Sequence, residues 1–387
     1  MMQAEVMDAI GFVRQLQEAA NARDASRLGR FYAEDAVAVS PVFGEVKGRR
    51  EIVRTFEELF ETLPDCVFEL SEVFSDGNRL AFLGVVTATD TSGWFGLLPT
   101  GAAVSYRMTI VCTLEGEKII HEDRLYDLTG VVERLEKARI DAELKTASEV
   151  QSALLPRIAK AGARWEAVAD SIPCRAIGGD FFEIVEWESG DVGVALGDVE
   201  GKGTPAALVG AMLHGMFISD AQTGLGPAAT LQRMNRQLAA RHPGDSTIAS
   251  RHRGSRFATL VYGVLSPDGR FLYSNAGHSP PALLTRGGPL RLTSGGPILG
   301  AFPDASFEVG EARLSAGDTL LLFSDGVTEA SNARDEEFGE ERLVACAAEH
   351  SARSPAEMLD RILSAVREFC GSTPQTDDIT AAAVRFR

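Results

Sequence analysis

The stretch GDVEGKGTPAALVGAML, residues 197–213, decides the fold of the C-terminal two-thirds of the chain. An apolar run, Val192 to Leu196, leads into Asp198, and glycines stand on both sides of this aspartate. A carboxylate at the end of a buried strand, beside glycines that let the backbone approach a ligand, is typical of an ion site. The proline of Gly203-Thr204-Pro205 then predicts a helix that runs from Pro205 to Asp220, and Pro355 predicts another that runs to Cys370. The turn Pro267-Asp268-Gly269 predicts a hairpin of Phe257–Leu265 and Phe271–Asn275.

Three further aspartates stand in similar Gly- or Ser-flanked contexts and beside apolar runs. They are found in Gly178-Gly179-Asp180, Ser324-Asp325-Gly326 and Thr376-Asp377-Asp378. Oxygen ligands without His or Cys suit hard cations such as Mg²⁺ and Mn²⁺ better than zinc. The four motifs together therefore predict a carboxylate-lined metal centre.

Each motif also has a simpler explanation when it is taken alone. Gly-Gly-Asp and Ser-Asp-Gly are common turns, and Asp377-Asp378 could form an Asx turn. The loop around Lys202 could bind phosphate at the helix start, although the wider dinucleotide-binding spacing is absent. Lys202 could equally be a solvated loop lysine, and His278 in Asn275-Ala276-Gly277-His278 could be a base or part of a structural turn. It is the combination that favours the metal centre.

The composition excludes several classes of protein. The 387 residues carry 38 basic and 55 acidic side chains, a net charge of −17 that argues against binding to nucleic acid or anionic membranes. The 5 scattered cysteines contain no Cys-x-x-Cys pair, which indicates a reducing compartment. Residues 1–10 lack a basic signal region, and the longest apolar stretch, Ala206 to Ile218, is too short to span a bilayer. We expect a cytoplasmic protein.

The N-terminal third predicts a small α+β domain. Residues 4–63 are amphipathic with a helical period, and from Cys66 the period changes to two. The alternation from Val104 to Leu114 predicts a half-buried antiparallel strand that turns at Glu115-Gly116-Glu117 into Lys118 to Leu128. The apolar positions that we expect on the helix faces are Ile10, Val13, Leu16 and Ala20, followed by Ile52, Phe56, Leu59, Phe60 and Leu63.

A polar cluster lies on the last of these strands. Alternation puts His121 and Asp123 on one face and Arg124 and Tyr126 on the other. A His-Asp pair inside a pocket could perform acid–base chemistry. Exposed charge or a dimer contact is the simpler interpretation.

The segments FYAEDAVAVSP and EKIIHEDRLYDLTGVVERL, with their helix and strand order, resemble a SnoaL-like domain of the nuclear-transport-factor-like superfamily. The resemblance covers roughly residues 5–130. It implies a conical, curved antiparallel sheet with helices and a pocket, in a domain that catalyses, binds a ligand or dimerises. We assign residues 1–129 to this domain and expect it to act as a sensor or dimerisation module.

Residues 130–157 form the predicted linker. This charged, Ala- and Leu-rich stretch has no Gly or Pro between Gly130 and Pro156, which predicts one helix that ends at the proline. A seven-residue-like apolar repeat with one phase break favours pairing of two such helices in a homodimer, with a single surface helix as the alternative. The apolar positions are Val131, Leu135, Ala138, Ile140, Leu144, Ala147 and Leu154.

The C-terminal segments resemble, in order, the SpoIIE/RsbU branch of the metal-dependent protein phosphatase (PPM) family. The match includes ASEVQSALLP, IGGDFFEIV, FATLVYGVL, YSNAGHSPPALL, LLLFSDGVTEASN and QTDDIT, besides the stretch quoted first. It implies an α/β/β/α sandwich of two antiparallel sheets over residues 158–387. It also implies hydrolysis of phosphoserine or phosphothreonine on a regulatory protein, an anti-sigma factor antagonist in relatives.

The resemblance implies roles for individual residues. Asp180 would bridge two metal ions, Asp198 and the backbone carbonyl of Val199 would bind beside it, and Asp325 and Asp377 would bind the other ion. Asp378 would be secondary. Two divalent ions about 4 Å apart can hold a phosphoryl group and lower the pKa of a bridging water, so no Ser or Cys nucleophile is needed.

One segment departs from the family pattern. Residues 241–256 place four arginines and two histidines in an otherwise acidic protein. This basic segment predicts either a surface loop or a docking surface for an acidic phosphoprotein. Two other functions stay open at this point: a non-catalytic regulatory scaffold, and a small-molecule isomerase fused to a phosphatase.

Overall fold

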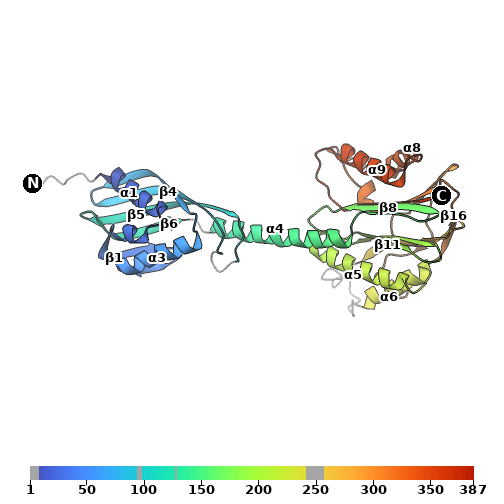
Figure 1. The fold of residues 1–387 in the computed structure, drawn as a ribbon, viewed down its shortest axis with the longest axis horizontal. Helices are drawn as coiled ribbons and strands as arrows, with labels where there is room; N and C mark the ends of the chain where they lie inside the picture. The colour runs from blue at the N-terminus through green and yellow to red at the C-terminus, as the bar shows by residue number, and fades with distance from the viewer. Residues whose placement is uncertain (1–7, 94–97, 127–128, 241–256) are drawn as a thin grey trace, which may run out of the picture. The chain divides into compact units, whose positions relative to one another are not determined.

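The computed structural model describes residues 8–93, 98–126, 129–240 and 257–387. The chain forms two compact units, Met1–Leu144 and Lys145–Arg387. The division falls inside helix α4 (Thr129–Leu154), so the first turns of this helix belong to one unit and the last turns to the other. Figure 1 shows the helices and strands of each unit.

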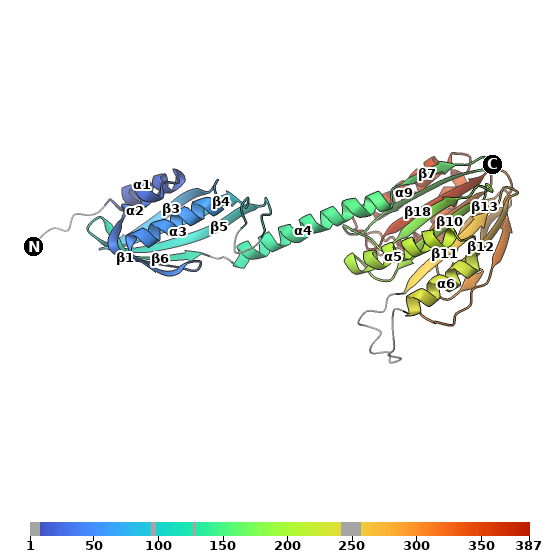
Figure 2. The ribbon, with the colours of Figure 1, turned by 60° about the horizontal axis from the view of Figure 1, so that its bottom comes forward.

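The N-terminal unit is one six-stranded sheet with helices packed against it (Figure 2). Its strand order is β2-β1-β6-β5-β4-β3, and all neighbours are antiparallel except β1 and β6, which pair in parallel. The strands are β1 (Tyr32–Ser40), β2 (Gly44–Lys47), β3 (Val67–Asp76), β4 (Arg79–Thr89), β5 (Ala103–Glu115) and β6 (Lys118–Tyr126). The helices are α1 (Ala9–Asn21), α2 (Ala25–Gly29) and α3 (Arg49–Thr62).

The expectation of helix throughout residues 4–63 was wrong in two respects. Strands β1 and β2 separate α2 from α3, and the alternating burial of Tyr32, Ala36 and Ala38 is the strand signal that the helical interpretation passed over. Ile10 is 61% exposed and does not share the buried face of Val13. At about 100° of helix rotation per residue, Ile10 points to one side of the buried stripe formed by Ala9, Val13, Leu16 and Ala20.

The strand predicted from Val104 to Leu114 is confirmed as β5. Its side chains alternate between the interior and the outer face, and Val104, Met108 and Cys112 are buried. Gly116 has a φ of 59° in the tight turn into β6. That left-handed conformation favours glycine, so the turn predicted at Glu115-Gly116-Glu117 has a local cause.

Helix α4 begins inside the N-terminal core. Val131 and Leu135 are each 1% exposed, and an Nη2 group of Arg134 donates to the Ser105 carbonyl at 2.7 Å. Val131 and Leu135 therefore cannot belong to an exposed helix-pairing seam, which corrects that part of the predicted repeat. Ile140 and Leu154, further along the helix, remain exposed.

The C-terminal unit is a sandwich of two sheets. One sheet has the order β15-β12-β11-β10-β9, with β16 beside β12, and the other has the order β14-β13-β17-β18-β8-β7. The first contains β9 (Phe181–Glu186), β10 (Val192–Val199), β11 (Ala258–Leu265), β12 (Arg270–Ala276), β15 (Gly295–Gly296) and β16 (Gly310–Arg313). The second contains β7 (Ile158–Ala161), β8 (Trp165–Ile172), β13 (Ala282–Thr285), β14 (Gly288–Arg291), β17 (Thr319–Phe323) and β18 (Ile379–Phe386).

Helices cover the outer face of each sheet, which completes the predicted α/β/β/α arrangement. Figure 1 shows α5 (Thr204–Ala221) and α6 (Pro227–Ala240) on one side of the stacked sheets, with α8 (Gly339–Glu349) and α9 (Pro355–Cys370) on the other. Three buried clusters fill the spaces between these four layers. Strands buried on both faces need continuous apolar sequence, and the burial of all five residues of β17 agrees with this. The predicted fold class is confirmed.

Local signals fixed several of these elements. The predicted helices at Pro205 and Pro355 are confirmed as α5 and α9, and Ser354 and Glu357 form a capping box at the start of α9. The hairpin predicted through Pro267-Asp268-Gly269 joins β11 to β12. No helix in the described ranges is long and apolar enough to cross a membrane. The basic segment 241–256 lies outside the described residues.

Candidate metal centre

Strand direction brings the four aspartate motifs to one end of the sandwich. Asp180 directly precedes β9 and Asp198 is near the end of β10, and these two strands are antiparallel neighbours. In the other sheet, Asp325 follows β17 and Asp377 precedes β18, which are also antiparallel neighbours. Within each sheet, the end of one strand therefore lies beside the start of the next.

Three of the four aspartates line one cavity. Asp198, Asp325 and Asp377 border a pocket of about 360 Å³ together with Val199 and Thr259. Asp180 does not line this pocket; it is buried and interacts electrostatically with Asp198. The structure thus brings three of the sequence-predicted carboxylates and Val199 around one small volume, with Asp180 buried beside Asp198.

The carboxylates raise one another's pKa values. Burial raises the pKa of Asp180 well above its usual value, and the neighbouring Asp198 raises it further. Burial, followed by repulsion from Asp325, raises the pKa of Asp198 to about 6. The pKa of Asp325 is also raised by burial and by Asp377. Buried like charges disfavour the ionised forms, and a nearby cation would reverse this effect.

One buried atom tests whether these residues fit a metal ion. The Oδ2 atom of Asp180 is buried and has no hydrogen-bond partner among the residues that the structure describes. An unpaired buried carboxylate oxygen costs free energy unless another group satisfies it. A hard cation held by oxygen ligands fits this position, since the charged groups that act on Asp180 are the carboxylates of Asp198 and Asp378.

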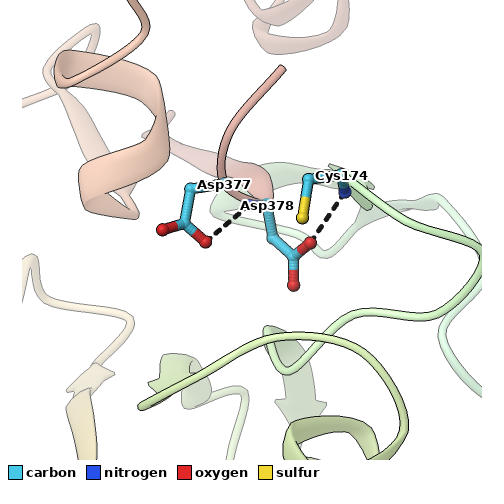
Figure 3. Close-up of side chains that lie close together, drawn as sticks. All are labelled: Cys174, Asp377 and Asp378. Atoms are coloured by element: carbon cyan, nitrogen blue, oxygen red, sulfur yellow. Dashed lines mark hydrogen bonds between the residues drawn. The ribbon is translucent and has the colours of Figure 1, made fainter. Parts of the chain in front are cut away.

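Asp378 holds the loop that carries Asp180. Its Oδ1 atom accepts a hydrogen bond from the Cys174 amide at 2.8 Å, and its Oδ2 atom accepts from the amides of Gly179 at 2.7 Å and Asp180 at 3.4 Å. Figure 3 shows Asp378 turned toward Cys174, while Asp377 points away from it. Asp378 is therefore a positioning carboxylate that ties the start of β18 to the loop before β9.

Two glycines make this arrangement sterically possible. A Cβ atom at Gly178 would lie 2.3 Å from Oδ2 of Asp378, and one at Gly326 would lie 2.1 Å from the Asp378 carbonyl oxygen. Both distances are far below van der Waals contact. The glycines flanking the aspartates thus allow the two loops to approach each other.

A cysteine lies beside the candidate centre. The Cys174 Sγ atom and carboxylate oxygens of Asp377 and Asp378 all lie within 4.8 Å of one another. Burial and the neighbouring Asp378 raise the pKa of the Cys174 thiol to about 11. The thiol is therefore protonated at neutral pH, and Cys174 is a poor nucleophile there.

Lys202 is ion-paired rather than freely solvated. Its Nζ atom lies 3.3 Å from a carboxylate oxygen of Asp377 and donates to the Thr376 carbonyl. Lys202 therefore partly compensates the negative charge of Asp377. Both Asp377 and Thr376 belong to the loop before β18. The Lys202 side chain is 37% exposed, so the pair contributes little to stability.

His278 lies in a turn that two hydrogen bonds with Asn275 close, and its position is structural rather than that of a base. Its amide donates to Oδ1 of Asn275 at 2.7 Å, and Nδ2 of Asn275 donates back to the His278 carbonyl at 2.9 Å. Burial lowers the pKa of His278 to about 4, so the ring is neutral at pH 7. Its Nδ1 atom is 2.7 Å from the hydroxyl of Thr259, which lines the pocket.

Gln151, which the sequence interpretation did not single out, connects helix α4 to the same loop. Its Nε2 group donates to the Gly178 carbonyl at 2.7 Å, and its Oε1 atom accepts from the Gly178 amide at 3.0 Å. Both backbone groups of a residue two positions before Asp180 are therefore bonded to this helix. The segment ASEVQSALLP contained the signal, as a polar residue at the last turns before Pro156.

The His121–Asp123 pair does not face a cavity. The two side chains are 44% and 46% exposed and lie 3.3 Å apart on the outer face of β6. Their neighbours Glu122 and Arg124 point inward and are 2% and 9% exposed. The possibility of acid–base chemistry by His121 and Asp123 inside a pocket is thus wrong, because strand alternation puts the other face toward the interior.

Comparison with known families gives two matches that fit the two units. The model of "Stage II sporulation protein E (SpoIIE)" matches residues 188–387, and the model of the SnoaL-like domain matches residues 13–122. The first match covers more than half of the chain, and both agree with the resemblances seen in the sequence.

The chain is also similar to two curated proteins and to one solved domain. Protein IcfG of Synechocystis is 30% identical over 62% of this chain and 41% of its own length. Phosphoserine phosphatase RsbU of Bacillus subtilis is 30% identical over 58% of this chain and 64% of its own length. The chain thus matches less than two-thirds of each curated relative. The solved SiaA-PP2C domain of Pseudomonas aeruginosa matches with a TM-score of 0.55 and 19% identity, covering 65% of this chain and 99% of that one, which supports the fold.

Proposed function

Because the chain belongs to the SpoIIE family, we propose that it is a metal-dependent protein-serine/threonine phosphatase. Asp198, Asp325 and Asp377 line one pocket, and Asp180 is buried beside Asp198. This arrangement of carboxylates is the observation that carries the proposal. An uncompensated group of buried carboxylates is unstable by itself and is suited to bind cations.

We assign two divalent ions, Mn²⁺ or Mg²⁺, to this centre. Asp180, Asp198 and the Val199 carbonyl would hold one, and Asp325 and Asp377 would hold the other with Asp180 shared. When bound, the ions supply charge that holds a phosphoryl group and makes a water molecule nucleophilic. Neither Cys174 nor His278 needs to act as nucleophile or base. The Cys174 thiol is protonated at neutral pH, and the His278 ring is buried.

The surrounding residues position this centre. Asp378 fixes the loop before β9 through three backbone amides, and Gln151 fixes Gly178 in the same loop. Because an error of about 1 Å in the position of a reacting group can cost about 100-fold in rate, both residues should affect activity without touching the substrate.

The proposed substrate is phosphoserine or phosphothreonine on a regulatory protein. The support is the similarity to phosphoserine phosphatase RsbU, and we propose an anti-sigma factor antagonist as the protein substrate. A phosphorylated side chain at the surface of a folded protein could reach the pocket, because the side chain of Asp377, which lines the pocket, is 37% exposed.

We further propose a cytoplasmic homodimer in which the N-terminal unit binds a small molecule and regulates the phosphatase. The free cysteines fit a reducing compartment. Exposed apolar side chains of α4, Ile140, Val150 and Leu154, support pairing of two such helices.

Purified full-length protein should release phosphate from a phosphoserine-containing antagonist protein when Mn²⁺ is added. EDTA should abolish the release, and a second addition of Mn²⁺ should restore it. A folded protein that binds Mn²⁺ but never releases phosphate from phosphoserine or phosphothreonine substrates would indicate a regulatory scaffold instead.

A further inference from the structure

We propose that a hollow beside the metal centre receives a residue that flanks the phosphorylated serine or threonine of the protein substrate, and that Arg367 makes this hollow select an acidic residue. The inference rests on the proposed phosphatase function and deepens it, because it names a feature of the substrate that the metal centre alone does not specify.

The hollow adjoins the metal centre through one side chain. Its volume is about 270 Å³, and it is lined from α7 (Asp325–Thr328) and the residues just after it, from the last turn of α9, and from the loop before β18. Asp377 lines this hollow and also the pocket that Asp198 and Asp325 line. Consecutive residues of a peptide lie about 3.8 Å apart. A phosphorylated residue bound in the pocket of the metal centre therefore brings its neighbours in the substrate within reach of the hollow.

The floor of the hollow is apolar and its opening is polar. Ala330, Val366 and Ile379 line the floor and are 8%, 1% and 6% exposed. A free anion would lose its hydration against such a floor, whereas the stem of a substrate side chain gains contact with it. The exposed residues that line the opening are Arg367, Gly371, Pro374, Gln375 and Thr376.

One cation gives the hollow its charge preference. Arg367 is the only positively charged side chain among the described residues that line it. Arg367 is exposed and forms no ion pair with any other residue in the described ranges. Its guanidinium group, which carries five N–H donors, is therefore available to a carboxylate of the substrate.

The acidic side chain that lines the hollow, Asp377, is already paired. The Nζ atom of Lys202 lies 3.3 Å from its Oδ2 atom, and its Oδ1 atom accepts a hydrogen bond from the Asp378 amide at 2.9 Å. A basic substrate residue would meet Arg367 without gaining an unpaired carboxylate. The hollow therefore favours acidic residues and disfavours basic ones.

The loop that lines the hollow is fixed before a substrate binds. The Nε2 group of Gln375 donates to the carbonyls of Ile172 and Asp377, each at 2.7 Å. At the end of α9, the Gly371 amide donates to the Arg367 carbonyl at 2.9 Å. Because these contacts already order the backbone, little conformational freedom is lost on binding.

The test compares phosphoserine peptides on the intact chain in the presence of Mn²⁺. The peptides share one sequence except at the residue on either side of the phosphoserine, which is Asp, Asn or Lys. On one of the two sides, we expect kcat/KM to be about threefold higher for Asp than for Asn and about tenfold higher for Asp than for Lys, the worth of an exposed ion pair and of its reversal. The difference should arise in KM, since the contact is the same in the ground state and the transition state. A preference for Lys, or equal kcat/KM for all three residues on both sides, would overturn the proposal.

Variants of α9 locate the selectivity. Arg367→Met should make the three peptides equivalent, and Arg367→Glu should invert the order of Asp and Lys. Rates are expressed relative to p-nitrophenyl phosphate in the same variant, because this small substrate has no flanking residue. Arg361→Glu makes the same charge change at an exposed position of α9 outside the hollow, and it should keep the order Asp, Asn, Lys. An order that persists in Arg367→Glu, or that inverts equally in Arg361→Glu, would contradict the role of Arg367.

Inhibition by inorganic phosphate identifies the occupant of the hollow. Arg367→Met should weaken this inhibition less than it weakens hydrolysis of the Asp peptide, because free phosphate has no flanking residue. If both are weakened equally, the hollow binds a free anion rather than a substrate residue, and the proposal is wrong.

Binding separates this proposal from the proposed function. Labelled peptides that carry a non-hydrolysable phosphonate in place of phosphoserine report affinity by fluorescence anisotropy, whether or not phosphate is released. Tighter binding of the Asp peptide than of the Lys peptide, with no phosphate release from any substrate, would refute the phosphatase function alone. Phosphate release without any preference in hydrolysis or binding would refute the role of the hollow alone, and the absence of both binding and release would refute both.

Discussion

The two units bury charge in opposite ways. In the N-terminal unit, Glu122 meets Arg124 and Tyr32, so its buried carboxylate is compensated within the protein. In the C-terminal unit, Asp180 and Asp198 face further carboxylates, and one oxygen of Asp180 has no hydrogen-bond partner in the described part of the chain. Where a buried carboxylate is paired with a cationic side chain, its charge is balanced within the protein. Where buried carboxylates face only one another, a bound cation is needed to balance their charge. The contrast distinguishes the paired cluster of the N-terminal unit from the candidate metal centre.

The largest expected effect comes from removing one carboxylate of the uncompensated cluster. Asp180→Asn or Asp325→Asn should lower Mn²⁺-dependent phosphate release by several orders of magnitude, because a ligand of the activating ions is lost. Folding should be retained, since the substitution relieves repulsion among the carboxylates. Phosphate release from a phosphoserine protein measures the effect, and the exposed Asp304→Asn is the control. Undiminished activity in either variant would refute the two-metal assignment.

Removing one partner of the compensated cluster should instead affect stability. Arg124→Met leaves Glu122 buried without its cation, and we expect a loss of about 3–5 kcal/mol in the N-terminal unit. The double variant Glu122→Gln/Arg124→Met should lose much less. Hydrogen exchange of the β5 and β6 amides measures the stability of the N-terminal unit in both variants. If the two variants lose the same stability, the ion pair of Glu122 with Arg124 does not matter for folding.

The pH dependence of metal-free protein sharpens the contrast. Because the pKa of Asp198 is raised to about 6 in the folded state, folded protein holds this proton more tightly than unfolded protein does. The free energy of unfolding should therefore fall as pH rises from about 4 to about 6, by about 3 kcal/mol for Asp198 alone. Urea unfolding in EDTA measures this loss, and saturating Mn²⁺ should reverse it above pH 6. A stability that rises over this range in EDTA would contradict the crowded-carboxylate description.

A smaller effect is expected from loosening the loop before Asp180. Gln151→Ala removes two hydrogen bonds to the backbone of Gly178 and should raise the Mn²⁺ concentration needed for half-maximal activity by about tenfold. Glu149→Ala, an exposed position on the same helix, is the matched control. Titration of activity with Mn²⁺ distinguishes the two, and identical titration curves would show that α4 does not support the centre.

The smallest expected effect concerns pairing of helix α4 in a dimer. Wild-type protein should sediment as a dimer at micromolar concentration, and Leu144→Asp should weaken the dimer by placing a charge in the apolar repeat. Lys145→Asp introduces the same residue at an exposed neighbouring position and should have a smaller effect. A monomeric wild-type chain would end the pairing hypothesis.

Local sequence signals predicted most elements. Prolines near their N-termini marked α5 and α9, and alternation marked β5, because both signals depend on residues close together in the sequence. The helical interpretation of residues 4–63 failed at β1, whose short alternation stands between two amphipathic helices. A strand of this kind is defined by its neighbours β2 and β6, which the local pattern does not contain.

The two families of domain, most of their elements outside residues 32–47 and the four aspartate motifs could be recognised in the sequence. The way in which the buried charges are compensated could not, because it depends on contacts between distant segments. Gly179 meets Asp378 across 199 positions of sequence, and Tyr32 meets Glu122 across 90. Periodicity records which face of an element is buried, but not which distant side chain lies opposite. For that reason the positioning roles of Asp378 and Gln151, and the pairing of Arg124 with Glu122, emerged only from the folded chain.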